Sequence, residues 1–325
     1  MLFTRKNMLL MSICLLTGCS AGFLGLAPAG DRKEYVQARD AYDAAHYQEA
    51  ISQLRDYIYK TKNVSRREAR AYRLLGSSYE KLGNPSQALE TYLEALEFHP
   101  KNVPLLVETG RLYQQNGLTA RSIEMYERAL TLAPENVEAL SGQAANYANL
   151  GFFSKARSLY EQLFALADNI SAQDQARYAS TFLRQREYAQ AFIHITQALA
   201  QEKTNPDFWL LTAQARRGLH QPALALDDLQ MAISLAPQRT DLLAHKALWL
   251  YDMGEYQASL QTTQDLLKQS PQNTLAQLIQ ALNWLKQGKK KAAQKQLAQI
   301  AQTTPTSFVG QVAAKLATDS FTSPK

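Results

Sequence analysis

Cysteine and histidine are scarce in this chain, and their placement removes two classes of protein. The sequence has 2 cysteines and 5 histidines in 325 residues. Both cysteines, Cys14 and Cys19, lie near the N-terminus, so no disulfide bond can stabilise the rest of the chain. No histidine has a second histidine four residues away, the spacing that places two metal ligands on one helix face. We therefore expect no metal ion and no other cofactor.

Catalytic motifs are missing as well. The sequence contains no HExxH motif for a zinc peptidase and no GxxxxGK[ST] loop for binding phosphates. Its carboxylates are spread along the chain without a distinct pair for acid–base catalysis. We therefore expect no catalytic residues, and the chain is predicted not to be an enzyme. Turnover of a substrate by the purified protein would revive the enzyme alternative.

Neither sign of charge dominates the sequence. It has 35 lysines and arginines against 29 aspartates and glutamates, a formal net charge of +6. A dedicated nucleic-acid-binding protein would carry a larger basic excess concentrated on one face. We therefore expect no nucleic-acid partner.

The N-terminus has the three regions of a secretory signal. Arg5 and Lys6 precede an apolar stretch from Met8 to Leu16, and small residues follow it. This stretch is too short to remain as a membrane span. A cytoplasmic protein whose first residues only imitate a signal is the alternative.

The end of this stretch, Leu16-Thr17-Gly18-Cys19, resembles the bacterial lipobox. The resemblance implies that residues 1–18 are a lipoprotein signal peptide and that Cys19 becomes the lipidated first residue. An ordinary signal peptide with a buried thiol is the alternative. Ser20 stands where an aspartate commonly retains lipoproteins in the inner membrane, so the resemblance favours the outer membrane and its periplasmic face. Residues 19–30 are small and mostly uncharged, which predicts a lipidated flexible tether.

A unit of about 34 residues repeats along the rest of the chain. The repeats begin near residues 31, 69, 103, 137, 172, 206, 240 and 274. Small residues such as Gly76 and Gly110 recur where two helices would cross closely, and large rings such as Tyr79 recur where a gap would be filled. Glycines that suit a left-handed turn end the first half of most units, and prolines that stop a helix end the second half. The glycines are Gly83, Gly117, Gly151, Gly254 and Gly288; the prolines are Pro100, Pro134, Pro237, Pro271 and Pro305.

This pattern resembles the tetratricopeptide repeat (TPR). The resemblance implies an all-α fold, a right-handed superhelical solenoid of about eight TPR helix–turn–helix repeats over residues 31–305. Residues 306–325 are expected to form a capping helix and a tail, because apolar residues recur at helical spacing from Phe308. The first and fifth repeats are degraded, with Ala45 and Arg186 in place of the turn glycine.

In TPR proteins the first helix of each repeat lines a concave groove. On this alignment the groove is mildly basic and would accept an acidic or C-terminal segment of a protein partner, since guanidinium groups pair well with carboxylates. The alternative is an ordinary mixed polar surface, and acids such as Glu80, Asp207 and Asp252 also fall there. The predicted groove residues are Arg70, Arg73, Arg111, Gln114, Asn149, Arg177, Arg184, Gln214 and Arg217.

The last repeat carries an apolar strip on its nominal groove face. This strip could bind a partner helix, or the capping helix could cover it; we expect the cap. Its residues are Leu275, Leu278, Ile279, Leu282 and Leu285.

The combination of lipobox, tether and repeats resembles the pilus-assembly lipoproteins of the TadD and PilF/PilW types. It implies a non-enzymatic scaffold, lipid-anchored to the outer membrane, that binds protein components of a Flp or type IV pilus or a secretion system. The alternative is an adaptor for murein hydrolases or for outer-membrane protein assembly, similar to NlpI or the BamD group.

Overall fold

The structure is a computed structural model of the chain, and it describes residues 29–60 and 68–319. The predicted signal peptide, Cys19 and most of the predicted tether lie outside the described residues. The tether was expected to extend to residue 30, but the first helix already begins at Ala29. Alanine is the strongest helix former, so the helix can start two residues before the first repeat position.

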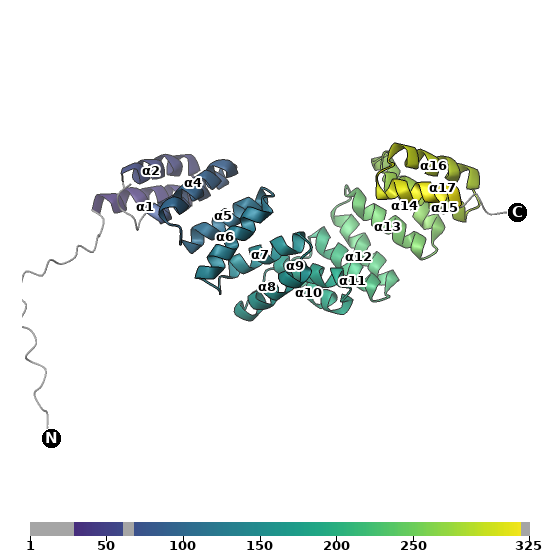
Figure 1. Cartoon of the computed structure of the whole chain (residues 1–325), viewed down its shortest axis with the longest axis horizontal. Helices are drawn as coiled ribbons and strands as arrows, with labels where there is room; N and C mark the ends of the chain where they lie inside the picture. The colour runs from purple at the N-terminus through teal and green to yellow at the C-terminus, as the bar shows by residue number, and fades with distance from the viewer. Residues whose placement is uncertain (1–28, 61–67, 320–325) are drawn as a thin grey trace, which may run out of the picture. The chain divides into compact units, whose positions relative to one another are not determined.

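Seventeen α-helices, and no strand, make up the described part of the chain (Figure 1). They are α1 (Ala29–Asp43), α2 (Tyr47–Lys60), α3 (Glu68–Lys81), α4 (Pro85–Phe98), α5 (Val103–Gln115), α6 (Thr119–Leu132), α7 (Val137–Asn149), α8 (Phe153–Leu166), α9 (Ala172–Arg184), α10 (Tyr188–Gln201), α11 (Pro206–Gly218), α12 (Pro222–Leu235), α13 (Thr240–Asp252), α14 (Tyr256–Gln269), α15 (Thr274–Lys286), α16 (Lys290–Thr303) and α17 (Phe308–Asp319). The first sixteen form eight consecutive pairs, α1/α2 to α15/α16, which confirms the eight predicted repeats.

The chain divides into two compact units, Met1–Leu112 and Tyr113–Lys325, and their boundary falls within α5. In the first unit, α1 packs on α2, α2 on α3, and α3 on α4, while the first helices α1 and α3 also touch. Its core contains Leu54, Tyr57, Tyr72 and Tyr92, which are almost fully buried. Each pair therefore buries its apolar side against the next pair, as a repeat protein requires.

The second unit repeats the same packing. Each helix pair from α7/α8 to α15/α16 is in contact, and the first helices α7, α9 and α11 touch in succession. Small residues lie at the close crossings, and several of them, including Ala144, Ala179 and Ala213, are completely buried. The first helices α7, α9 and α11 thus lie next to one another, and each packs on the second helix of its own repeat.

The turn between the two helices of a repeat uses a left-handed residue. The five predicted glycines have φ between 72° and 84°. Ala45, Arg186 and His220 hold the same turn in the first, fifth and sixth repeats, with φ of 60° to 62°. The degraded repeats therefore keep the turn geometry, at the steric cost that a side chain meets in this region.

Gly76 confirms the expected close crossing of α3 and α4. A Cβ atom added at Gly76 would lie 2.1 Å from Cε1 of Tyr92. Tyr92 is itself fully buried, so the ring cannot move aside. The phenol therefore fills the space that the missing side chain leaves.

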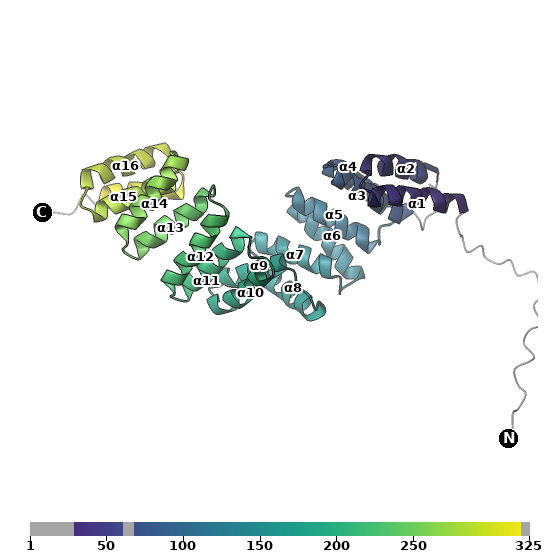
Figure 2. The same cartoon turned by 180° about the vertical axis from the view of Figure 1, so that it is seen from behind.

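The predicted capping helix is present as α17, which packs on α16 and α15 (Figures 1 and 2). Val309, Val312 and Leu316 of α17 share one hydrophobic cluster with Leu278 and Leu285 of α15. Leu282 joins the same cluster, whereas Leu275 remains 36% exposed. The cap therefore covers most of the apolar strip, and the partner-helix alternative for this strip loses its basis.

Among the described helices, none has both the length and the apolar character needed to cross a membrane.

Candidate partner-binding surfaces

All nine predicted groove residues lie on first helices of their repeats. Arg70, Arg73 and Arg111 belong to the first unit, and the other six belong to the second. The prediction treated them as one basic surface. Within each unit, the structure gives the partners that these side chains find.

Arg111 is held by two carboxylates in the first unit. Its Nη2 donates to Glu80 at 2.6 Å and to Glu108 at 2.8 Å. Burial lowers the pKa of Arg111, but the hydrogen bonds to the two glutamates outweigh this and raise it. The Tyr92 hydroxyl also donates to Glu80, at 3.0 Å. Arg111 therefore joins α5 to α3 through Glu80, and its charge is already paired within the first unit.

Arg70 and Arg73 are different. Arg70 is exposed and Arg73 half-buried, and neither forms an ion pair within residues 29–60 and 68–319. The Nε of Arg73 is buried and has no hydrogen-bond partner there. These two arginines, one turn apart on α3, are the predicted groove cations of the first unit that a partner can reach.

In the second unit, Arg217 and Arg177 also have acidic partners. Nη2 of Arg217 lies 2.5 Å from Asp252, and the guanidinium lies 5.1 Å from the centre of the Trp249 ring. Nη1 of Arg177 lies 3.8 Å from Asp174. Arg184 is exposed at the end of α9 and forms no ion pair with the described residues. Of the six arginines in the whole predicted set, three are thus paired with acidic residues of their own unit: Arg111, Arg177 and Arg217.

The uncharged groove residues also differ in whether their side chains already have a hydrogen-bond partner. Nε2 of Gln114 donates weakly to the Gly142 carbonyl, at 3.4 Å. Asn149 is exposed and Gln214 half-buried, and neither forms a hydrogen bond through its side chain within the described chain. They remain available to a partner.

A ladder of ion pairs between successive first helices went unrecognised in the sequence. Arg239 contacts Asp207 of α11 at 2.5 Å and Asp241 of α13 at 2.7 Å. The hydrogen bond from Arg239 is the main reason why the pKa of Asp241 is lowered. The recurrence of acids among the groove positions could have indicated these ion pairs. Those acids serve contacts between neighbouring repeats, as Glu80 and Asp252 do.

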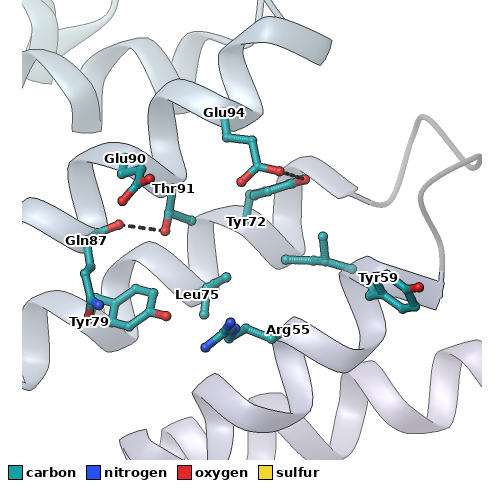
Figure 3. Close-up of a pocket in the computed structure, with 10 residues that line it drawn as sticks. Arg55, Tyr59, Tyr72, Leu75, Tyr79, Gln87, Glu90, Thr91 and Glu94 are labelled. Atoms are coloured by element: carbon teal, nitrogen blue, oxygen red, sulfur yellow. Dashed lines mark hydrogen bonds between the residues drawn. The ribbon is translucent and has the colours of Figure 1, made fainter.

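The first unit also contains a pocket of about 400 Å³ between α2, α3 and α4 (Figure 3). Its floor is formed by the buried side chains of Ile58, Tyr72 and Leu75. Glu90 and Glu94 of α4 stand at one side of its mouth. The sequence did not reveal this pocket, because its lining comes from three helices and includes ordinary surface residues.

Within the part of the chain that the structure describes, no three His, Cys, Asp or Glu side chains come together as a potential metal site.

Comparison with known proteins identifies the repeats. Two family models, both described as tetratricopeptide repeat, match residues 35–103 and 104–136. No curated protein matches the sequence.

Several solved structures share the fold. A tetratricopeptide repeat protein from Parabacteroides merdae matches with a TM-score of 0.57 and 16% identity, over 79% of this chain and 99% of that one. PilW, described as a widely conserved type IV pilus biogenesis factor, matches with a TM-score of 0.59 and 16% identity, over 66% of this chain and 98% of PilW. PilF from Pseudomonas aeruginosa matches with a TM-score of 0.54 and 18% identity, over 66% and 96% of the two chains. The chain thus carries tetratricopeptide repeats in residues 35–136, and its helices follow the fold of tetratricopeptide-repeat proteins.

Proposed function

We propose that this protein is a lipid-anchored scaffold that binds protein partners during assembly of an envelope machine, such as a Flp or type IV pilus or a secretion system. The observation that carries the proposal is the repeat array itself. Its side chains are used for packing between neighbours, and what remains is an extended surface for other proteins. A scaffold of this kind acts by holding partners and needs no catalytic residues.

The assignment to pilus or secretion assembly draws support from the likeness to PilW and PilF. Two thirds of this chain superimpose on nearly the whole of each, and PilW is described as a pilus biogenesis factor. The sequence Leu16-Thr17-Gly18-Cys19 supports the same proposal, since it resembles the lipobox of bacterial lipoproteins and Ser20 favours the outer membrane. An adaptor for murein hydrolases or outer-membrane protein assembly remains the second candidate, because it would use the same anchor and the same fold.

The proposed binding surface of the first unit is centred on Arg70 and Arg73 of α3. Both guanidinium groups lack an acidic partner among the described residues, and the buried Nε of Arg73 lacks any acceptor. An acidic side chain or a C-terminal carboxylate would form charge-assisted hydrogen bonds with the accessible part of these guanidinium groups. The partner is therefore proposed to present an acidic segment to α3.

Lipid anchoring is tested by metabolic labelling with a radioactive fatty acid. The wild-type chain should take up label and fractionate with the outer membrane. Cys19→Ala should take up none and leave the membrane fraction, because a diacylglycerol and an acyl chain together supply the anchoring energy. An unlabelled wild-type chain would overturn the lipoprotein assignment. A labelled Cys19→Ala variant would show that another residue is modified.

A further inference from the structure

The large rings that recur in the repeats are accompanied by cations. The eleventh residue is aromatic in the second to fifth repeats, which begin at residues 69, 103, 137 and 172, and again in the eighth repeat, where it is Trp284. In three of these repeats a cation of the same chain lies over the ring. The distances from cation to ring centre are 5.7 Å for Arg121 over Tyr113, 5.2 Å for Lys155 over Tyr147 and 4.6 Å for Arg157 over Phe182. This position of the fold therefore favours a cation–π contact.

The second repeat has the ring without the cation. Tyr79 is its eleventh residue, and no lysine or arginine of the described chain lies over it. In the third and fourth repeats the cation is the nineteenth residue, Arg121 and Lys155, and Gln87 occupies this position in the second repeat. The cation over Phe182, Arg157, comes instead from the preceding repeat. The pocket of about 400 Å³ lies beside Tyr79, with Tyr79 and Gln87 in its wall (Figure 3).

The mouth of the pocket is acidic on one side. Glu90 forms no hydrogen bond or ion pair within the described residues, and Glu94 accepts a hydrogen bond of 3.0 Å from the Tyr72 hydroxyl. The fourth repeat has Ser158 and Gln162 at these two positions, so the acidic pair does not belong to the general repeat pattern. Two carboxylates would attract a cation into the space beside Tyr79.

One cation already lines the pocket, and it faces the glutamates from the other side. Arg55 of α2 is exposed, forms no ion pair within the described residues and lies across the pocket from Glu90 and Glu94 (Figure 3). Its guanidinium is not over the Tyr79 ring. The lining thus keeps a formal excess of one negative charge, since two carboxylates face one guanidinium.

The apolar floor of the pocket suits the hydrocarbon part of a cationic side chain. Ile58 and Leu75 are buried apolar side chains, and Tyr72 presents a ring beside them. Lysine and arginine carry long apolar stems that pack on surfaces of this kind while the charged end stays near polar groups.

We propose that this pocket receives a lysine or arginine side chain from a protein partner, in the place that Arg121 and Lys155 fill in the next two repeats. The proposal rests on the proposed scaffold function and adds to it a second, basic contact point on the partner. The pocket residues Tyr72, Leu75 and Tyr79 differ from Arg70 and Arg73, so the two sites on α3 bind opposite charges.

The test is an NMR titration of the full chain, with ¹³C-labelled tyrosine and the Tyr79 signal assigned through Tyr79→Phe. The probes are N-acetylarginine amide, N-acetyllysine amide and the uncharged N-acetylnorleucine amide. The two cationic probes should shift the Tyr79 signal saturably, and the norleucine probe should bind at least about tenfold more weakly, the factor expected for losing a cation–π contact and its carboxylate partners. Equal binding of all three would overturn the proposal.

Two variants sharpen the result. Gln87→Arg should fill the pocket from within, as Arg121 does beside Tyr113, and should weaken binding of the arginine probe at least about tenfold. Gln190→Arg is the matched control, because Gln190 is the nineteenth residue of the fifth repeat, where Arg157 already lies over the ring. It should bind the probe as the wild type does. Unchanged binding by Gln87→Arg, with its thermal unfolding also unchanged, would contradict the proposal.

The double variant Glu90→Gln, Glu94→Gln is an independent test. Its binding of the arginine probe should also be weaker by at least about tenfold. The outcome does not depend on lipidation. Probe binding by a chain whose Cys19 proves unlabelled would therefore preserve the pocket and reject the anchor, whereas a labelled chain that ignores the probes would reject the pocket alone.

Discussion

At the scale of single residues, the repeats are distinguished by buried polar pairs. The twentieth residue of each repeat is small, and it is serine in two repeats, at Ser122 and Ser259. In both cases the next repeat supplies an asparagine. Nδ2 of Asn146 donates to Ser122 at 2.7 Å, and Nδ2 of Asn283 donates to Ser259 at 2.8 Å. The same two positions hold Ala191 and Ala215 elsewhere in the chain, so the polar pairs make two repeat boundaries different from the others.

We predict that Ser259→Ala costs more than its small volume change suggests. Asn283 is fully buried, and its Oδ1 has no partner within the described residues. Losing the serine leaves a buried amide donor with only the Ile279 carbonyl, which should reduce the free energy of unfolding by about 1–3 kcal/mol.

Chemical denaturation of the two single variants and the double variant measures this coupling. Ser259→Ala with Asn283→Leu should recover most of the loss, because replacing both polar partners by apolar groups removes the desolvation cost. Strictly additive effects of the two changes would show that the hydrogen bond contributes nothing.

Much of the residue-scale packing could be predicted. Gly76 was expected to be small because two helices cross there, and the Tyr92 ring occupies the space. The charge pairs could not be predicted in the same way. Arg111 and Arg73 both fall on groove positions, but whether a guanidinium reaches a carboxylate depends on side-chain conformation across two helices. Arg111 reaches Glu80, and Arg73 reaches none among the described residues.

At the scale of the helix–turn–helix element, the turn is more constant than its sequence. Five repeats have glycine at the left-handed position, and three have Ala45, Arg186 or His220 with nearly the same φ. Packing of the two helices therefore imposes the left-handed turn. Glycine is the residue that suits this turn best, but three repeats adopt it without glycine. This explains why the degraded first and fifth repeats could be aligned by their small and aromatic positions although they lack the glycine.

We predict that Arg186→Gly stabilises the protein by about 0.5–1 kcal/mol. Glycine removes the steric cost of the left-handed conformation, and this gain exceeds the entropy that glycine adds to the unfolded chain. Urea denaturation of the wild type and the variant measures the difference.

Gly151→Ala is the matched control for this prediction. A Cβ atom added at Gly151 would meet nothing within 4 Å, so its expected loss of about 1 kcal/mol would come from the backbone alone. If Arg186→Gly destabilised the protein, the side chain of Arg186 would have to contribute a stabilising interaction larger than this strain.

At the scale of the whole molecule, the chain consists of two units built from one element. Ion pairs join successive repeats in both units, as Arg111 with Glu80 does in the first and Arg239 with Asp207 in the second. In the first unit, Arg70 and Arg73 remain unpaired among the described residues, and the pocket beside Tyr79 lacks the cation that later repeats supply. The first unit is therefore where we place the partner.

The repeat period was sufficient to predict the number of helix pairs and the cap, because both follow from apolar spacing. It was insufficient to predict the pocket. In the sequence, Gln87 is an ordinary polar residue at the position that holds Arg121 and Lys155 in the next two repeats. That these two cations lie over Tyr113 and Tyr147 is known only from the distances in the structure. The nine predicted groove residues likewise share a position in the repeat but differ in what they contact.

In-cell cross-linking from the first unit tests the anchored scaffold most directly. A photo-reactive residue replaces Lys81, an exposed residue near the end of α3, and the captured protein is identified by mass spectrometry. We predict one discrete envelope protein in the outer-membrane fraction, a pilus or secretion component with an acidic segment. The capture should be lost with Arg70→Glu and Arg73→Glu and kept with Lys101→Glu, a charge reversal at an exposed loop residue outside the predicted groove set. Capture that survives the double reversal, or that yields cytoplasmic proteins, would contradict the account.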